Sequence, residues 1–204
     1  MTGEGSPDRR PDGTDHDWNV VESRTEYETG WYTGGYDLVE LPDGRTKKYY
    51  WAELPPAAVI VAVVDSAELR SAGRRTQSDD DQVLMVEQFR PTIRELCYEL
   101  PAGIVEDGES FTTAGARELR EETGFEPNST ALLEEFWCST GVLRHKRGIV
   151  WAEGLEPAKR KLDGNEFLAV RTVPVAEALE LARRPPANDA TIEGLLLAEE
   201  AGLI

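Results

Sequence analysis

Glu118, Glu121 and Glu122 form an acidic cluster in which the second and third glutamates follow the first by three and four residues. The stretch that holds them, Ser110–Thr123, contains no proline and is followed by Gly124, so it predicts one helix with a left-handed C-cap. On a helix this spacing lets the three carboxylates converge near the last turn, where they repel one another and oppose the helix dipole. Clustered carboxylate oxygens are the ligands that Mg²⁺ prefers. The pattern indicates a divalent-cation site, with a solvated acidic helix face as the alternative.

The residues around these glutamates form a longer pattern. Five residues separate Gly103 from Glu109, and seven separate Glu109 from Arg117. Residues 103–125 read G-x5-E-x7-R-E-U-x-E-E-x-G-U, where U is a bulky apolar residue. Average residue usage puts a chance match at about one in a hundred million per start position. This is the complete box of the Nudix hydrolases, and the chain resembles that family.

The resemblance implies a reaction, a fold and a set of metal ligands. Nudix hydrolases cleave nucleoside diphosphates linked to another moiety, and their fold is an α/β/α sandwich, a mixed sheet between helices. By this resemblance Glu118 and Glu122 are the principal metal ligands and catalytic residues. Glu121 is an additional ligand or base, and the carbonyl of Ala102 is a further donor. The expected cofactor is Mg²⁺, with Mn²⁺ as a substitute, and such ions can clamp the reacting oxygens of a pyrophosphate.

Other box residues have structural roles by the same resemblance. Arg117 and Glu109 are expected to pair and hold the loop against the helix, and Leu119 is expected to face the core. Gly103 and Gly124 occupy positions where the backbone conformation, rather than a side chain, is required.

Two segments before the glutamates indicate one branch of the family. Residues 83–91 read VLMVEQFRP, and residues 98–103 read YELPAG. An E-Q-x-R strand end followed by E-x-P-A-G is similar to the branch that hydrolyses ADP-ribose and related nucleotide sugars to a nucleoside monophosphate and a sugar phosphate. That resemblance implies that Arg90 contacts the substrate and that Glu99 lines the same pocket. The expected ligand is a nucleoside diphosphate-linked small molecule.

The chain departs from that branch after the box. Residues 139–147 read STGVLRHKR, so Thr140 replaces a proline that marks ADP-ribose hydrolases, and His145 or a neighbour replaces a loop glutamate that helps activate water. His145 can take a proton near neutral pH. The basic run of residues 144–147 can instead bind a phosphate or simply offset the acidic surface. The general base stays unassigned, and dinucleoside polyphosphates, UDP-sugars and oxidised nucleotides stay open as substrates.

The missing loop acid also keeps a second class of function open. A non-catalytic Nudix module would bind a nucleotide and regulate another process. The box retains every acidic position, which favours the enzyme. Hydrolysis is therefore the main prediction, and the binding module is the alternative.

Three regions are expected along the chain. Residues 1–17 are polar and rich in Gly, Pro and Asp, so they predict a disordered tail. Residues 18–56 gather Trp and Tyr and carry the turn signal Pro42-Asp43-Gly44, which predicts a β extension built on a hairpin. The resemblance implies that this extension joins two subunits in a homodimer and presents an aromatic ring to the base. Residues 57–204 are the expected Nudix domain.

Apolar patterns predict the elements of that domain. Ala57–Val64 is a continuous apolar run that fits a central strand buried on both faces, and Asp65–Gln82 is expected to be a surface loop. The remaining elements are strands at Ala131–Trp137, Gly148–Glu153 and Phe167–Thr172, and helices at Val175–Ala182 and Ala190–Ala201.

Charge and cysteine content argue against several partners. The chain has 22 basic and 39 acidic residues, a net charge of −17, whereas binding to nucleic acids or anionic membranes needs basic patches. Such a surface also repels an anionic substrate, so the metal and local arginines are needed for binding. The two cysteines lack CxxC spacing, which argues against a disulfide scaffold or structural zinc. The N-terminus shows no apolar signal segment, which predicts a cytoplasmic protein.

The acidic excess leads to a prediction about salt. Self-repulsion among surface carboxylates is relieved by screening, so the composition suggests a halophilic protein adapted to high ionic strength. We expect the melting temperature to rise strongly between low and molar KCl. A melting temperature that does not change over this range would contradict the prediction.

Overall fold

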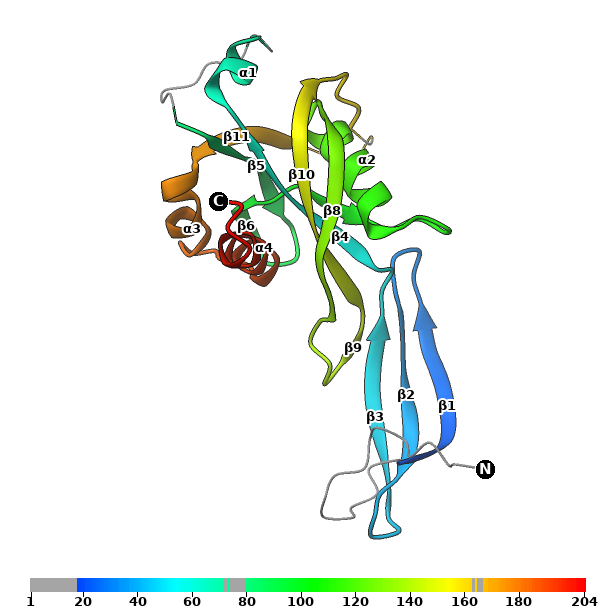
Figure 1. Cartoon of the computed structure of the whole chain (residues 1–204). Helices are drawn as coiled ribbons and strands as arrows, with labels where there is room; N and C mark the ends of the chain where they lie inside the picture. The colour runs from blue at the N-terminus through cyan, green and yellow to red at the C-terminus, as the bar shows by residue number, and fades with distance from the viewer. Residues whose placement is uncertain (1–17, 72, 74–79, 163, 165–166) are drawn as a thin grey trace, which may run out of the picture. The chain divides into compact units, whose positions relative to one another are not determined.

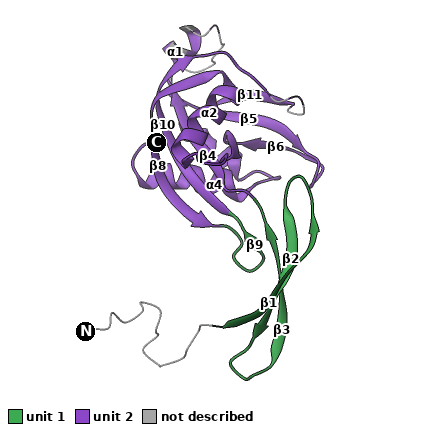
Figure 2. Cartoon of the chain, turned by 90° about the vertical axis from the view of Figure 1, so that its right-hand side faces the viewer, with its two compact units in different colours: residues 1–54, 138–145 green, residues 55–137, 146–204 purple. Residues whose placement is uncertain are grey.

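The computed structural model describes residues 18–71, 73, 80–162, 164 and 167–204 of the 204-residue chain. The chain divides into two compact units, which Figure 2 distinguishes by colour. Unit 1 is Met1–Leu54 with Cys138–His145, and unit 2 is Pro55–Trp137 with Lys146–Ile204. Unit 1 is discontinuous, because a loop from far along the chain belongs to it. The predicted tail at residues 1–17 lies outside the described residues.

The described residues of unit 1, 18–54 and 138–145, form a four-stranded sheet. In spatial order its strands are β1 (Asn19–Glu28), β2 (Thr33–Glu40), β3 (Thr46–Glu53) and β9 (Leu143–Arg144). β1 and β3 run antiparallel to β2, and the short β9 runs parallel to β3. Between β2 and β3, Gly44 N donates to Leu41 O (2.9 Å) and Leu41 N donates to Arg45 O (2.7 Å). The hairpin predicted around residues 42–44 is confirmed.

Unit 2 contains a seven-stranded mixed sheet. In chain order its strands are β4 (Ala57–Val64), β5 (Gln82–Arg90), β6 (Glu95–Glu99), β7 (Ala102–Ile104), β8 (Phe125–Trp137), β10 (Lys146–Pro157) and β11 (Leu168–Pro174). The order across the sheet is β11-β5-β4-β10-β8, with β6 paired to β5 and β7 paired to β4. β10 runs parallel to β4 and antiparallel to β8. The predicted strands of this unit are present, and β4 has the predicted bounds.

Four helices lie within the described residues: α1 (Ser66–Ser71), α2 (Phe111–Thr123), α3 (Val175–Ala182) and α4 (Asp189–Glu200). The predictions for α2, α3 and α4 are confirmed to within one residue at each end. The prediction of a surface loop from residue 65 to 82 is wrong at its start, where α1 forms. Asp65 Oδ1 accepts a hydrogen bond from Ala67 N (2.6 Å), and Leu69 is fully buried, so a local cap and a core contact stabilise this short helix.

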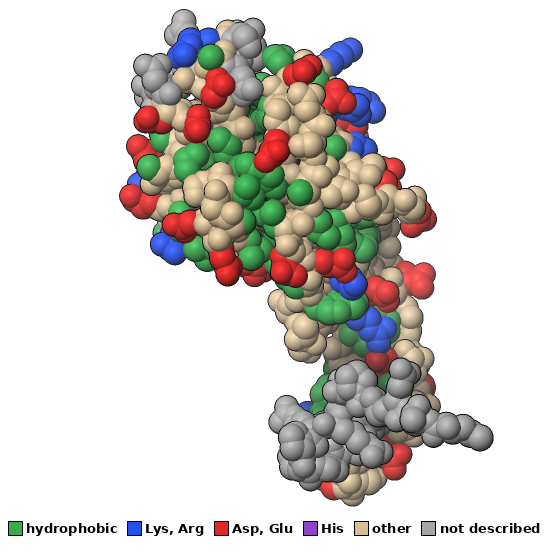
Figure 3. Space-filling model, viewed as in Figure 1, with side chains coloured by type: hydrophobic (Ala, Val, Ile, Leu, Met, Phe, Trp, Pro, Cys, Tyr) green, Lys and Arg blue, Asp and Glu red, His purple; other side chains and the backbone are tan. Residues whose placement is uncertain are grey.

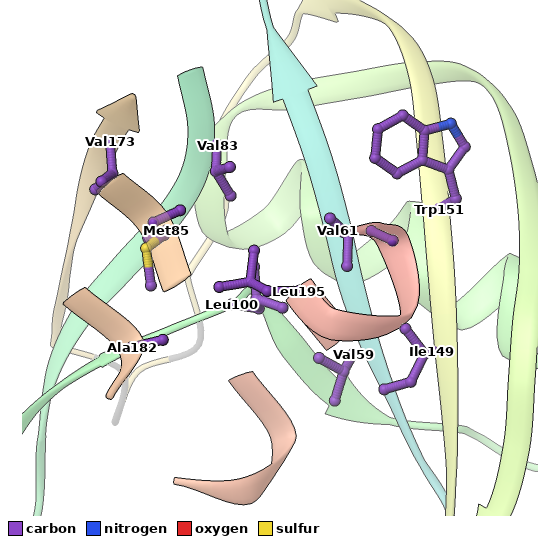
Figure 4. Packing of buried hydrophobic residues seen from close by; sticks show 12 residues of the cluster. Val59, Val61, Val83, Met85, Leu100, Ile149, Trp151, Val173, Ala182 and Leu195 are labelled. Atoms are coloured by element: carbon purple, nitrogen blue, oxygen red, sulfur yellow. The ribbon is translucent and has the colours of Figure 1, made fainter. Parts of the chain in front are cut away.

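Alternate residues of β4 face opposite sides of the sheet, as strand pleating requires. Val59 and Val61 pack with residues of α3 and α4, and Figure 4 shows them around Leu195 of α4. Ile60 packs in a separate cluster with Leu119 of α2. The sheet lies between α2 on one face and α3 and α4 on the other, as Figure 1 shows. The predicted α/β/α sandwich is confirmed.

The acidic excess is visible on the molecular surface. On the face shown in Figure 3, Asp and Glu side chains are distributed around unit 2, and Lys and Arg side chains are fewer. The visible face therefore carries the sign of charge that the composition predicts. In the described parts of the chain, every helix falls short of the length or the apolar character that crossing a bilayer requires.

Replacing Leu119 by Ala is expected to destabilise unit 2, because it opens a cavity beneath α2. Leu119 is fully buried, and such changes cost about 2–5 kcal/mol. The matched control is Leu196→Ala on α4, since Leu196 is 39% exposed. The control is expected to change the free energy of unfolding by no more than about 0.5 kcal/mol. Urea denaturation followed by circular dichroism measures both, and equal losses would contradict the assigned packing.

Candidate active site

Caps define both ends of α2, the helix that carries the acidic cluster. At its start Ser110 Oγ accepts a hydrogen bond from Thr113 N (3.1 Å). At its end Gly124 adopts the left-handed conformation (φ 74°), and its N–H donates to Arg120 O (3.0 Å). These bonds satisfy backbone groups that a helix otherwise leaves unpaired. The last turn therefore has a defined end.

Arg117 connects the acidic cluster to the loop before the helix. Its Nε and Nη2 donate to the two carboxylate oxygens of Glu109 (3.0 and 2.9 Å), and Nη2 also donates to Ile104 O (2.9 Å). Its Nη1 lies 2.6 Å from Glu118 Oε1 and 3.5 Å from Glu121 Oε2. The hydrogen bonds from Arg117 lower the pKa of Glu109, and the same bonds raise the pKa of Arg117. The predicted pairing of Arg117 with Glu109 is confirmed.

Glu118 and Glu122 are buried against the backbone of β7. Glu118 is 8% exposed and Glu122 is 4% exposed. Glu122 Oε2 accepts a hydrogen bond from Ala102 N (3.1 Å), and a Cβ added to Gly103 would lie 2.0 Å from the carboxyl carbon of Glu118. A side chain at position 103 would therefore collide with this carboxylate. Buried carboxylates are costly unless donors or positive charge surround them, so this oxygen donor set fits a hard divalent cation.

The three predicted metal ligands do not form a ready-made triad. Among the residues that the structure describes, no three His, Cys, Asp or Glu side chains are grouped closely enough to hold an ion. In this arrangement Arg117 binds Glu118 and Glu121, and Ala102 N binds Glu122.

Arg90 and Glu99 lie on the same face of the sheet as the acidic cluster. Arg90 Nε lies 3.0 and 3.1 Å from the two Glu99 oxygens, and its Nη2 lies 2.5 Å from Glu99 Oε2. Gln88 Nε2 also donates to Glu99 Oε2 (2.9 Å). The hydrogen bonds to Glu99 raise the pKa of Arg90, and the negative charge of Glu122 adds to this effect. The structure thus pairs the two predicted substrate-binding residues with each other, and Glu122 of the acidic cluster is near enough to act on Arg90 electrostatically.

Three basic side chains after the box, those of Arg144, Lys146 and Arg147, form ion pairs with carboxylates. In unit 1, Arg144 Nη2 lies 2.5 Å from Asp37 Oδ2, and its guanidinium lies 4.0 Å from the centre of the Trp51 ring. In unit 2, Arg147 Nη1 lies 2.7 Å from Glu193 Oε2, and Lys146 pairs with Glu135. These pairs favour the interpretation in which the run offsets acidic charge rather than binding a phosphate. His145 O accepts a hydrogen bond from Cys138 N (3.0 Å), which closes the loop.

Sequence reasoning missed two polar residues near the acidic cluster. Gln88 donates a hydrogen bond to Glu99. Gln88 and Arg90 are two residues apart on a strand, so their side chains lie on the same face, and this spacing could have identified Gln88 from the sequence. Arg160 Nε donates to Glu122 O (2.6 Å). No motif or periodicity marks Arg160, because its contact depends on how the segment after β10 folds back.

Known proteins resemble this chain in sequence. The NUDIX domain family model matches residues 70–194. The ADP-ribose pyrophosphatase of Bacillus subtilis is 32% identical over 154 residues, which cover 74% of this chain and 76% of that protein. A methanol dehydrogenase activator of Bacillus methanolicus is 31% identical over 146 residues, which cover 71% of each protein.

A solved structure shares the fold. The crystal structure of an ADP compounds hydrolase has a TM-score of 0.75 at 22% identity and covers 92% of this chain and 97% of that one. At this identity the likeness supports the fold alone. The family model spans more than half of the chain and includes every position of the box. The chain therefore belongs to the Nudix hydrolase family.

Proposed function

We propose that this protein hydrolyses the pyrophosphate bond of a nucleoside diphosphate derivative in the presence of Mg²⁺ or Mn²⁺. The preferred substrate is ADP-ribose or another nucleotide sugar, and the products are a nucleoside monophosphate and a sugar phosphate. The observation that carries the proposal is the buried pair of carboxylates, Glu118 and Glu122, beside the Arg90–Glu99 pair. The name of the Bacillus subtilis relative supports the substrate class.

The residues that would hold the metal are Glu118, Glu122, Glu121 and the carbonyl oxygen of Ala102. When bound, a divalent cation neutralises nonbridging phosphate oxygens and lowers the pKa of the attacking water. The protein's part is to keep this oxygen set in place. Ala102 N fixes Glu122, and the absence of a side chain at Gly103 leaves room for Glu118.

Arg90 is proposed to bind the substrate, and Glu99 to orient it. The Arg90 side chain is 45% exposed, whereas that of Glu99 is 10% exposed. Glu99 engages the Nε and Nη2 edge of the guanidinium, so the Nη1 edge is the part that can meet a phosphate or ribose oxygen. A fixed guanidinium loses less freedom when it binds, and it supplies positive charge in a strongly acidic protein.

Two residues are candidates for the base that takes a proton from the attacking water. Glu121 is more exposed than Glu118, because 23% of the Glu121 side chain is exposed and only 10% of the Glu118 side chain is. His145, which belongs to unit 1, is a candidate by its residue type alone, because an imidazole can take up a proton near neutral pH. The variants Glu121→Gln and His145→Ala separate the two candidates, because only loss of the true base removes the rise of kcat with pH that accompanies deprotonation of that base.

A homodimer that forms through the sheet of unit 1 is part of the proposal. Several aromatic side chains of this sheet and its flanks are exposed, namely Trp18, Tyr27, Trp31, Tyr49 and Tyr50. Aromatic residues are enriched in protein interfaces, and a second copy of the chain would cover them. Sedimentation equilibrium of the full chain tests this part separately from the chemistry.

A regulatory module is the second candidate function. The Bacillus methanolicus relative is named as an activator of another enzyme, and its match covers most of this chain. In this case the protein would bind a nucleotide without releasing product. The complete acidic cluster favours the enzyme, and the absence of a loop glutamate at residues 139–147 favours the module.

The variants Glu118→Gln and Glu122→Gln are each expected to lower kcat roughly 10²–10⁴-fold, because a neutral amide is a poor ligand for a hard cation. The amide keeps the shape of the side chain, so the fold is expected to persist. Product chromatography with and without MgCl₂ measures the rates. The substrate panel is ADP-ribose, UDP-sugars, dinucleoside polyphosphates and oxidised nucleotides.

Glu126→Gln is the matched control, because this carboxylate lies just past α2 and its side chain is 60% exposed. It is expected to keep the rate of the unmodified protein. Unchanged rates in both box variants would refute the metal-ligand assignment. A protein that binds nucleotide in calorimetry but releases no product with any member of the panel would support the regulatory module instead.

A further inference from the structure

The segment after β10 folds across the C-terminal end of α2. Ala158 N donates to Gly124 O (2.9 Å), and Lys161 N donates to Glu121 O (3.1 Å). Between these two contacts, Arg160 Nε donates to Glu122 O (2.6 Å). Figure 1 shows the chain passing from β10 around this end of the helix. The carbonyls of two of the predicted ligands, Glu121 and Glu122, are thus capped from outside the helix.

These contacts matter because of where α2 places its acids. The last carbonyls of a helix lack partners within the helix and carry partial negative charge. Glutamates in the same turn add full negative charge to that end, which favours fraying. A guanidinium there satisfies a carbonyl and offsets the charge. Arg160 does both at Glu122, the most deeply buried acid of the box.

Arg160 also ties α2 to the sheet. Its Nη2 donates to Leu168 O (2.9 Å) at the start of β11, so one side chain bridges two elements. Gly124 allows this approach, because a Cβ at that position would lie 3.3 Å from Ala158 O and 3.4 Å from Arg160 Cβ. The last glycine of the box therefore serves two purposes, the left-handed cap and the seat for this segment.

Arg160 and Arg117 affect the acidic cluster in opposite ways. Arg117 binds the carboxylates of Glu118 and Glu121, so it competes with a cation for ligand oxygens. Arg160 binds the backbone of Glu122, whose carboxylate is held separately by Ala102 N. Glu122 is thus fixed at its main chain and at its side chain, and the contact made by Arg160 occupies no carboxylate oxygen.

We propose that Arg160 is a positioning residue that raises the affinity of the acidic cluster for its divalent cation. It does so by holding the backbone of Glu122 in register with β11, so that less freedom is lost when the carboxylates close on the ion. The proposal rests on the proposed function, since it assumes that Glu118 and Glu122 bind the cation. Residues that orient metal ligands commonly change metal affinity 10–100-fold when they are removed.

Mn²⁺ binding to the full-length protein tests the proposal without reference to turnover. Electron paramagnetic resonance of free Mn²⁺ gives the Kd for the unmodified protein, Arg160→Ala, Arg160→Lys and the control Lys159→Ala, whose side chain is exposed. Arg160→Ala is expected to raise Kd about tenfold or more, and Lys159→Ala to leave it within about twofold. Arg160→Lys keeps the charge but replaces two separate donor nitrogens by a single ammonium nitrogen, so its Kd is expected to lie between those of Arg160→Ala and the unmodified protein.

The outcomes separate this proposal from the proposed function. If the unmodified protein binds no Mn²⁺, both are overturned. If it binds Mn²⁺ and Arg160→Ala binds equally well, only the role of Arg160 is overturned. Circular dichroism shows whether Arg160→Ala is folded at the assay temperature. If it is unfolded, Arg160→Lys tests the proposal instead, and a Kd of Arg160→Lys equal to that of the unmodified protein refutes the bridging role of Arg160.

Discussion

Carboxylates near the C-terminal end of a helix repel one another and are also repelled by the partial negative charge of that end. α2 carries three such carboxylates in its last turns. Each costs about 0.3–1 kcal/mol when exposed, and burial raises the cost further. Compensating groups come from three parts of the chain: Arg117 within the helix, Ala102 N in β7, and Arg160 after β10. Arg117 binds the carboxylates of Glu118 and Glu121, and Ala102 N binds one carboxylate oxygen of Glu122. Arg160 binds the backbone carbonyl of Glu122. The acidic cluster therefore depends on a strand and a loop that lie far apart in sequence.

The sheet places the second polar group, Arg90 with Glu99, beside this cluster by simple alternation. β5 and β6 are antiparallel, with Gln88 opposite Cys97, so every second residue of each strand shares one face. The apolar residues of β5 near its start serve the two hydrophobic clusters, and its polar end reaches the face of α2. One strand thus contributes to the core and to the candidate site, and the change from one role to the other takes only a few residues.

Local sequence signals predict much of the fold and of the candidate site. The features that the sequence does not predict depend on contacts between residues far apart in the chain. The caps of α2, the apolar run of β4 and the pairing of Arg117 with Glu109 are encoded within short stretches, so the sequence anticipates them. α1 escapes prediction because its stability includes burial of Leu69, which periodicity over six residues does not reveal. The ion pair of Arg144 with Asp37 joins residues 107 positions apart. Arg160 is invisible for the same reason, since nothing near it in sequence identifies Glu122 as its partner.

The position of the two-residue strand β9 in the sequence affects how the chain folds while it is being synthesised. β1, β2 and β3 are synthesised before β4 to β8, whereas β9, the fourth strand of their sheet, is synthesised after them. Until then Ala52 and Glu53 at the end of β3 lack their partners in β9, and an open strand edge is a template for pairing with another nascent chain. Completion of the unit 1 sheet therefore waits on its own later segment, Cys138–His145, and most of unit 2 is made before that segment.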